Sequence, residues 1–347
     1  MNLKQSLIIG ITLCILGTIG WEIYWRSKGY YPDLDNNEAL FAVQRNRVKR
    51  ALDSDIIIVG SSRIHFDIQL DVWKQETGIK PIQLAYPGAT PLPVFHDLVN
   101  HTDFVGTIIV GVTPGLFFSS TSTEKRAYRS ANDKVEYFHN RTYAQRLNHL
   151  LSIPLQESLA FISDADGVDA IKLQFLLEGI QFGNRIEGND FPPFPNFADI
   201  SLDRNLRMTE KTARDTSFAR LIKNVWSFKS TPETPPREMS KDSVMELFVK
   251  DAKIFQERGG KLVLLRCPST GYYRKKEENF YCRDEFWDEL VKQSGAKGYH
   301  FEDYKQLKDL DCPEWSHLSG EDADFFTAEI AKIMMNDNTI PIKLKTN

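Results

Sequence analysis

The sequence lacks a strong charge of either sign. Its 43 Lys and Arg residues against 47 Asp and Glu residues give a formal net charge of −4 over 347 residues. A surface that binds nucleic acid needs a concentrated basic field, and no such field is present, so we expect no nucleic acid partner. Apolar residues make up 41% of the chain, which is enough for an ordinary globular core and excludes a disordered chain.

Cysteine is also scarce. The chain has four cysteines, of which Cys14 lies in an apolar N-terminal segment and Cys267, Cys282 and Cys312 lie far downstream. No CxxC pair and no cluster of histidine and cysteine indicates zinc, so neither a metal nor another cofactor is expected. The three downstream cysteines permit one disulfide with one thiol left over, and unpaired cysteines are the alternative.

One long uncharged run is present, at residues 6–21. A membrane-spanning helix needs roughly 20 apolar residues, and the aromatic residues Trp21, Tyr24 and Trp25 at the far end suit a membrane interface. The residues that follow are bulky, whereas a signal-peptide cleavage site has small residues. The sequence therefore predicts an uncleaved transmembrane anchor over residues 1–28, with the rest of the chain outside the cytoplasm. A buried helix of a soluble protein is the alternative.

After the anchor, short continuous apolar runs alternate with helical stretches. This alternation predicts a doubly wound, flavodoxin-like α/β fold with a parallel sheet. The predicted strands are residues 55–59, 81–85, 107–112, 261–267 and 298–301. The predicted helices are residues 37–52, 68–77, 94–100, 243–258 and 321–335.

Residues 115–240 do not fit a minimal fold of this kind. A structureless loop of that length is uncommon inside a compact domain, so we predict an inserted, mainly helical subdomain. The insertion would divide the α/β domain into residues 29–114 and 241–347. Its predicted helical stretches are residues 143–151, 168–177 and 209–225.

Ligands of an open α/β sheet bind beyond the carboxyl ends of its strands, so the residues that follow each strand are candidate site residues. The first strand runs into Gly60-Ser61-Ser62-Arg63. A serine pair in this place is either a turn or helix N-cap, or it holds a nucleophile at the sheet edge. The other candidate segments are residues 86–90, 113–115 and 266–268, and residues 311–320 before the last helix.

These segments contain the groups that nucleophilic ester chemistry requires. Such chemistry needs a hydroxyl, an imidazole that takes its proton, a carboxylate that orients the imidazole, and donors for the oxyanion. Ser62 is the candidate hydroxyl and His317 the candidate imidazole. Glu314, three residues earlier, is the candidate carboxylate, with Asp311 as the second choice. Gly88 has no Cβ and is a candidate oxyanion donor.

Two arginines also lie at strand ends. Arg63 and Arg266 each follow or end an apolar strand, so they either form a structural salt bridge or bind an anionic or polyhydroxyl substrate. The other histidines are interpreted as core or solvated residues, and these are His65, His96, His101, His139, His149 and His300.

Taken together, the motifs resemble those of the SGNH (GDSL-type) hydrolase superfamily. Residues 60–63 resemble its first block, Gly-Asp-Ser-Leu, whose third residue is the nucleophile, and this selects Ser62 over Ser61. Residues 83–89 resemble the second block, so Ser62 and Gly88 are the implied oxyanion donors. Residues 314–319 resemble the block Asp-x-x-His, with glutamate in place of aspartate.

The third block departs from the family pattern. Family members carry Gly-x-Asn-Asp there, and the asparagine donates to the oxyanion. This chain has Gly111-Val112-Thr113-Pro114 instead. One donor of the oxyanion hole is thus in question, and the loss of such a donor removes several kcal/mol of transition-state stabilisation.

Within the superfamily, the layout is most similar to membrane-anchored bacterial proteins that modify envelope polymers, such as the D-alanyl transfer protein of teichoic acids and the alginate O-acetylation proteins. The resemblance implies a serine esterase or O-acyltransferase in the bacterial cytoplasmic membrane, with its ectodomain in the periplasm or extracellular space. Its substrate would be an envelope polysaccharide and its partner a membrane-bound O-acyltransferase. The alternative is an inactive glycan-binding or scaffold component.

Overall fold

The computed structural model describes residues 2–162, 192, 194–228, 230–237 and 239–343. The chain divides into two compact units. One comprises Met1–Asn37 with Thr142–Asp190, and the other comprises Glu38–Arg141 with Phe191–Asn347. The described part of the predicted insertion therefore contributes to both units. The helix predicted at residues 168–177 lies outside the described residues.

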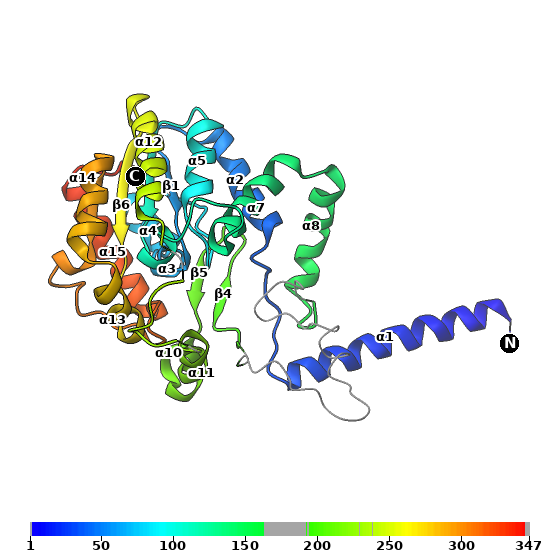
Figure 1. Cartoon of the computed structure of the whole chain (residues 1–347). Coiled ribbons are helices and arrows are strands. Elements are labelled where there is room, and N and C mark those ends of the chain that lie inside the picture. Colours follow the sequence, from blue (N-terminus) through cyan, green and yellow to red (C-terminus); the bar gives the residue numbers. More distant parts are fainter. Residues whose placement is uncertain (1, 163–191, 193, 229, 238, 344–347) are drawn as a thin grey trace. The chain divides into compact units, whose positions relative to one another are not determined.

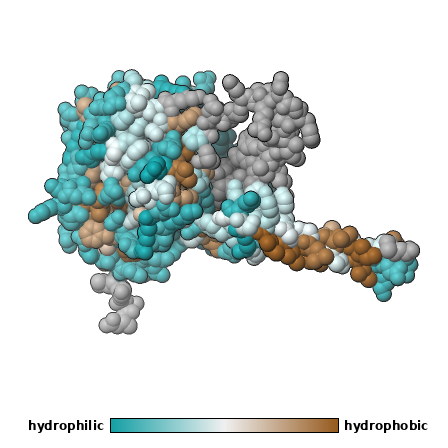
Figure 2. Space-filling view, turned by 90° about the horizontal axis from the view of Figure 1, so that it is seen from below, coloured by the Kyte–Doolittle hydropathy of each residue, from teal (hydrophilic) through white to brown (hydrophobic). Residues whose placement is uncertain are grey.

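The first unit contains α1 (Leu3–Ser27) and α8 (Tyr143–Gln156). Every residue of α1 except Trp25 and Glu22 is exposed, and Figure 2 shows this helix as a mostly hydrophobic rod. Among the described residues, α1 is the one helix whose length and composition would allow it to cross a membrane. At its far end, Glu22 accepts a hydrogen bond from Ala160 N at 3.0 Å. The apolar N-terminal helix predicted from the sequence is present.

The second unit is built on a five-stranded parallel sheet, with strand order β2-β1-β3-β6-β7 (Figure 1). This confirms the predicted α/β class with a parallel sheet. The strands are β1 (Ile56–Val59), β2 (Ile82–Gln83), β3 (Thr107–Gly111), β6 (Lys261–Arg266) and β7 (Lys297–His300). Each lies inside a predicted strand or within one residue of it, and β2 is the shortest.

Side chains on alternate residues of the strands enter two separate cores, because successive residues of a strand point to opposite faces. In β1, Ile57 and Val59 belong to one core and Ile56 and Ile58 to the other. The first core is completed by α2 (Glu38–Arg47), α5 (Leu92–Asn100), α12 (Lys241–Glu257) and α14 (Glu289–Ser294). The second is completed by α3 (Ser62–Asp67), α4 (Leu70–Thr77) and α15 (Gly320–Asn336).

The region predicted as an insertion adds elements to this unit. Helix α7 (Arg126–Asn140) packs on α2 and α5, after the short helix α6 (Pro114–Phe117). An antiparallel pair, β4 (Ala198–Ile200) and β5 (Leu206–Met208), follows. The stretch predicted as helical at 209–225 is two helices, α10 (Glu210–Arg214) and α11 (Thr216–Trp226). The break is at Asp215, whose extended backbone ends α10 and whose side chain caps α11. Helix α13 (Gly271–Phe280) follows β6.

All four cysteines are free. Cys267 and Cys312 are buried, and burial raises the pKa of both thiols well above the usual value. Of the two possibilities that the sequence left open, the structure therefore shows unpaired cysteines. Buried thiols with raised pKa values are poor nucleophiles, so neither competes with a serine for that role.

Candidate active site

The position of Ser62 depends on two glycines at the ends of neighbouring strands. Ser62 is the first residue of α3, and Gly60 and Ser61 connect this helix to β1. The side chain of Ile64, in the first turn of α3, packs over Gly60 and Gly111. A Cβ on Gly111 would lie 2.5 Å from Ile64 Cγ2, so any larger residue would push the helix away. The glycines thus allow α3 to sit tightly on the carboxyl ends of β1 and β3, with Ser62 half-buried at the edge.

The two serines of the pair have different surroundings. Ser61 is buried, and its hydroxyl donates to Thr113 Oγ1 at 2.6 Å. Although Ser61 occupies the N-cap position of α3, its side chain makes no capping hydrogen bond. Within the described part of the chain, Ser62 Oγ has no hydrogen bond. Of the two hydroxyls, Ser62 is therefore the one available to a ligand.

His317 and Glu314 form a buried pair. Glu314 Oε1 accepts hydrogen bonds from His317 Nδ1 at 2.8 Å, His317 N at 2.6 Å and Ser316 N at 3.2 Å. Glu314 Oε2 accepts from the indole N–H of Trp226. Both side chains are almost fully buried, at 2% and 0% exposure. Asp311 is exposed, so the carboxylate that contacts the imidazole is Glu314.

The surroundings of Glu314 keep it ionised. Burial alone would raise its pKa, but the charge and hydrogen bonds of His317 and the hydrogen bond from Trp226 outweigh burial and hold the pKa below the usual value. A carboxylate accepts but cannot donate, so His317 must carry its proton on Nδ1 whenever it is neutral. The lone pair of a neutral His317 is then on Nε2, as a general base requires.

Nε2 of His317 is a buried polar atom without a hydrogen-bond partner among the described residues. Such an atom costs about 1–3 kcal/mol, and in native proteins it calls for an explanation. The ring is held in place by stacking on Phe66, with centroids 4.2 Å apart. The imidazole is thus fixed and oriented, and its Nε2 makes no hydrogen bond to any described residue.

Helix α3 and the segment around His317 lie side by side. Phe66 stacks on the imidazole, Leu318 N donates to Asp67 Oδ1 at 3.0 Å, and Arg63 Nε donates to Ser316 Oγ at 3.4 Å. No hydrogen bond joins Ser62 to Nε2. In unliganded enzymes this bond is often long and tightens when substrate binds.

The loop that carries the pair is strained at Trp315. Its φ of +79° lies in the left-handed region, which bulky residues rarely adopt. The indole packs against Gly271, where a Cβ would collide with it, and stacks on Tyr272 with centroids 5.9 Å apart. Strain of this kind, held by the surrounding packing, is typical of functional loops.

Arg63 and Arg266 share one carboxylate. Glu277 Oε1 lies 2.6 Å from Arg63, and Glu277 Oε2 pairs with Arg266 and accepts from Ser269 Oγ at 2.7 Å. Both guanidinium groups are buried. Burial alone would raise the pKa of Glu277, but the two arginines lower it below the usual value. Of the two roles that the sequence left open, this geometry corresponds to the salt bridge, and contact with a substrate stays a prediction.

The predicted oxyanion donors lie at neighbouring strand ends. Gly88 is exposed in a turn after β2, with φ of +68° that suits glycine. The turn is fixed by Thr90 N, which donates to Ala127 O of α7 at 3.2 Å. Thr113 stands where the family pattern has asparagine, and its Oγ1 accepts the hydroxyl of Ser61. The roles of Ser62 N–H and Gly88 N–H in binding an oxyanion stay predictions.

Several residues of the site have no signal in the sequence. Trp226 holds Glu314 from 88 positions away, and Glu277 comes from a polar helix between two strands. Burial raises the pKa of Asp67 well above the usual value, and its Oδ1 accepts from Leu318 N at 3.0 Å. Thr113 directly follows the predicted strand 107–112 and stands where the family pattern has asparagine, so the sequence did indicate this residue.

Comparison with models of known protein families and with curated protein sequences gave no match.

Proposed function

We propose that the protein is a serine esterase or O-acyltransferase of the SGNH type. The observation that carries this proposal is the buried Glu314–His317 pair beside the helix that begins with Ser62. In this pair, Nε2 of His317 has no hydrogen-bond partner in the part of the chain that the structure describes. The strand order places the first strand between the second and the third, as the predicted flavodoxin-like fold requires, and this supports the proposal.

In the proposed reaction, Ser62 Oγ attacks the carbonyl carbon of an ester while its proton passes to His317 Nε2. Glu314 stabilises the imidazolium through the Nδ1–H bond. The N–H groups of Ser62 and Gly88 donate to the oxyanion. The imidazolium then protonates the leaving alcohol, which leaves an acyl-serine. In the second half, His317 takes a proton from water or from a sugar hydroxyl, and the oxygen of that group attacks the acyl carbon. The bond from the acyl carbon to Ser62 Oγ then breaks, and the imidazolium returns its proton to Ser62 Oγ.

The setting of this chemistry follows from α1 and from the resemblance. An N-terminal helix able to cross a membrane supports a single-pass protein of the bacterial cytoplasmic membrane, with the α/β unit in the periplasm or extracellular space. The resemblance adds an envelope polysaccharide as substrate and a membrane-bound O-acyltransferase as the partner that supplies acyl groups. An acceptor hydroxyl on a glycan makes the protein a transferase, and water makes it an esterase.

A second candidate is an inactive glycan-binding or scaffold component. Two observations favour it. Nε2 of His317 is buried, so a substrate has to open the site before it can reach the base. The asparagine of the third block is replaced by Thr113, whose Oγ1 is already bonded to Ser61. A scaffold, however, gives no reason for an oriented imidazole with an unused nitrogen.

Labelling with a serine-directed fluorophosphonate separates the two candidates. We expect a covalent adduct on Ser62 of the full chain in detergent, located by peptide mass spectrometry. The adduct should be absent in Ser62→Ala and present in Ser61→Ala, provided that both variants unfold in urea near the wild-type midpoint. A folded wild-type protein that gives no adduct and hydrolyses no acetyl ester, yet binds polysaccharide equally with Ser62→Ala, would establish the scaffold role.

A further inference from the structure

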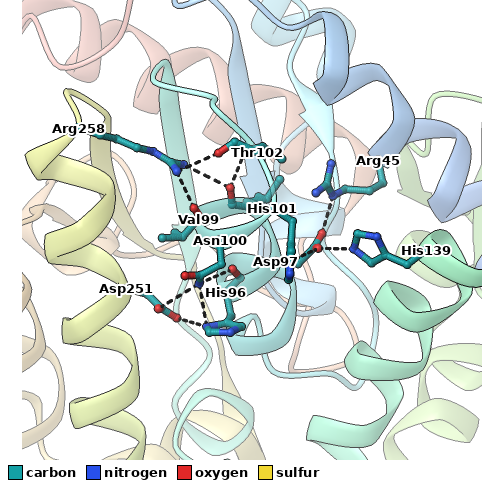
Figure 3. A network of polar contacts seen from close by, with 11 residues as sticks. Arg45, His96, Asp97, Val99, Asn100, His101, Thr102, His139, Asp251 and Arg258 are labelled. Carbon is teal, nitrogen blue, oxygen red and sulfur yellow. Dashed lines mark hydrogen bonds and ion pairs between the residues drawn. The ribbon is translucent and has the colours of Figure 1, made fainter.

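Two helices bring three potential metal ligands together, away from the site described above. Asp97 and the following C-cap residue His101 come from α5, and His139 comes from the last turn of α7 (Figure 3). Helix α5 connects β2 to β3, so it runs back from the carboxyl edge of the parallel sheet to the amino edge. The cluster thus lies towards the sheet edge opposite Ser62.

The ligand atoms of the three side chains converge. His139 Nε2 lies 2.6 Å and His101 Nδ1 lies 3.2 Å from Asp97 Oδ1. All three atoms lie within 4.8 Å of one another. Asp97 and His101 are four residues apart on α5, which places them on one helix face. A Zn²⁺ ion bound by nitrogen and oxygen at about 2.0–2.2 Å could replace these two contacts after small rotations of the imidazoles.

Arg45 fixes the direction of the Asp97 carboxylate. The carboxylate is buried, and its Oδ2 accepts from Arg45 Nε at 2.6 Å. Arg45 is itself buried and lies over the Phe138 ring at 4.8 Å. Outer groups that bond the second oxygen of a carboxylate ligand are a regular feature of metal sites, because they fix its direction. Oδ1 is left facing the two histidines.

The charges around the cluster are also compatible with a cation. Both histidines lie at helix C-termini, where the helix dipole favours positive charge. Arg258, the C-cap residue of α12, donates from its guanidinium to the carbonyls of Val99 and Thr102 at 2.5 and 2.9 Å (Figure 3). The side chains of His101 and His139 are 57% and 40% exposed, so an ion can enter from solvent.

We propose that Asp97, His101 and His139 bind a divalent transition metal, with Zn²⁺ as the best match. Two imidazole nitrogens and one carboxylate oxygen suit zinc, and a water molecule would complete the tetrahedron. The ion links the C-terminal ends of α5 and α7. Because Ala127 of α7 holds the turn that contains Gly88, the ion also stabilises the helix against which that turn is fixed. This proposal is independent of the proposed ester chemistry.

The test is a zinc titration of the full chain in detergent, free of affinity tags and stripped with a chelator. We expect one Zn²⁺ per chain, a rise in the melting temperature with zinc, and binding that weakens as the pH falls and the imidazoles are protonated. Co²⁺ should give the visible absorption of a tetrahedral site. His101→Ala and His139→Ala should each weaken binding at least 10-fold.

His96→Ala is the matched control. His96 is also a half-exposed histidine of α5, but it pairs with Asp251 at 2.8 Å and not with Asp97. The His96→Ala variant should bind zinc with the same affinity as the wild-type chain. The proposal is overturned if the wild-type chain shows no saturable binding, or if His96→Ala weakens binding as much as His139→Ala does. His139→Asn keeps a polar side chain on the surface and removes the imidazole. It should also weaken zinc binding, which would show that the loss of zinc affinity in His139→Ala does not come from misfolding.

Discussion

Replacing Glu314 by glutamine tests the hydrogen-bond network that orients His317. The glutamine amide has one accepting oxygen and one donating NH₂ group, and two orientations are open to it. If the oxygen takes the place of Oε1, it keeps the bonds from Ser316 N, His317 N and His317 Nδ1, and the NH₂ faces the indole N–H of Trp226. If the amide is reversed, both backbone N–H groups lose their acceptor.

The first orientation should win, because it keeps three of the four hydrogen bonds made to Glu314, whereas the reversed one leaves both buried backbone donors unbonded. Each such donor costs about 1–3 kcal/mol. In the preferred orientation His317 keeps its proton on Nδ1, so only the negative charge of the carboxylate is lost. The difference between a charged and a neutral hydrogen bond is about 1–2 kcal/mol, or roughly a 5- to 30-fold fall in kcat. A reversed tautomer would instead reduce kcat by about 10⁴.

The assays are hydrolysis of a chromogenic acetyl ester, urea unfolding and ¹⁵N NMR of the imidazole. Glu314→Gln should lower the free energy of unfolding by about 1–3 kcal/mol through the unbonded Trp226 N–H. Trp226→Phe removes that donor, so the double variant should be less destabilised than the sum of the single variants. Strictly additive effects, or a 10⁴-fold loss with Nδ1 unprotonated, would refute the reasoning. The unfolding and NMR results apply even if the protein hydrolyses no ester.

Two further predictions concern stability. Gly111→Ala should lower the free energy of unfolding by about 1–3 kcal/mol, because the added Cβ would collide with Ile64. Gly115→Ala is the control, since its added Cβ meets no atom closer than 3.7 Å and should change stability little. Equal urea midpoints for the two variants would contradict this prediction. Folding lowers the pKa values of Glu314 and Glu277. The two carboxylates therefore contribute fully to the free energy of unfolding above the unfolded pKa near 4.5, and this contribution is lost as the pH falls through their folded pKa values. The wild-type urea midpoint should therefore fall between pH 5 and pH 3 more steeply than that of Glu314→Gln, and parallel pH profiles would count against the ion pair.

The main strands and the helices between them were predictable because their apolar residues are local in sequence. Strands β1, β3 and β6 are buried on both faces, so they appear as unbroken runs of Ile, Val and Leu. Helix α3 has six residues, too few for a periodic pattern, and α13 is polar along most of its length. The pair β4–β5 is equally short, and its strands hydrogen-bond to each other and not to the main sheet.

The candidate site was predictable only in part. The Glu314-to-His317 spacing is local, so one turn can bring carboxylate and imidazole together, and the strand-end rule located Ser62. By contrast, Trp226 and Glu277 act through contacts between segments distant in the sequence, so no residue spacing predicts that they belong to the site. His101 and His139 were interpreted as core or solvated residues, because they come to share the neighbour Asp97 only when α5 and α7 pack together.

By itself, the sequence determined the apolar N-terminal helix, the α/β class, the parallel sheet and which candidate site residues lie at the strand ends. These properties depend on the apolar pattern and on turns, which act between residues close together in the chain. Tertiary structure alone decided that the hydroxyl of Ser61 is bonded to Thr113 and that Arg63 and Arg266 share Glu277. It also decided that Nε2 of His317 has no hydrogen-bond partner within the described ranges. Each of these depends on where burial removes water and which partner is within reach, and that is fixed only when distant segments pack together.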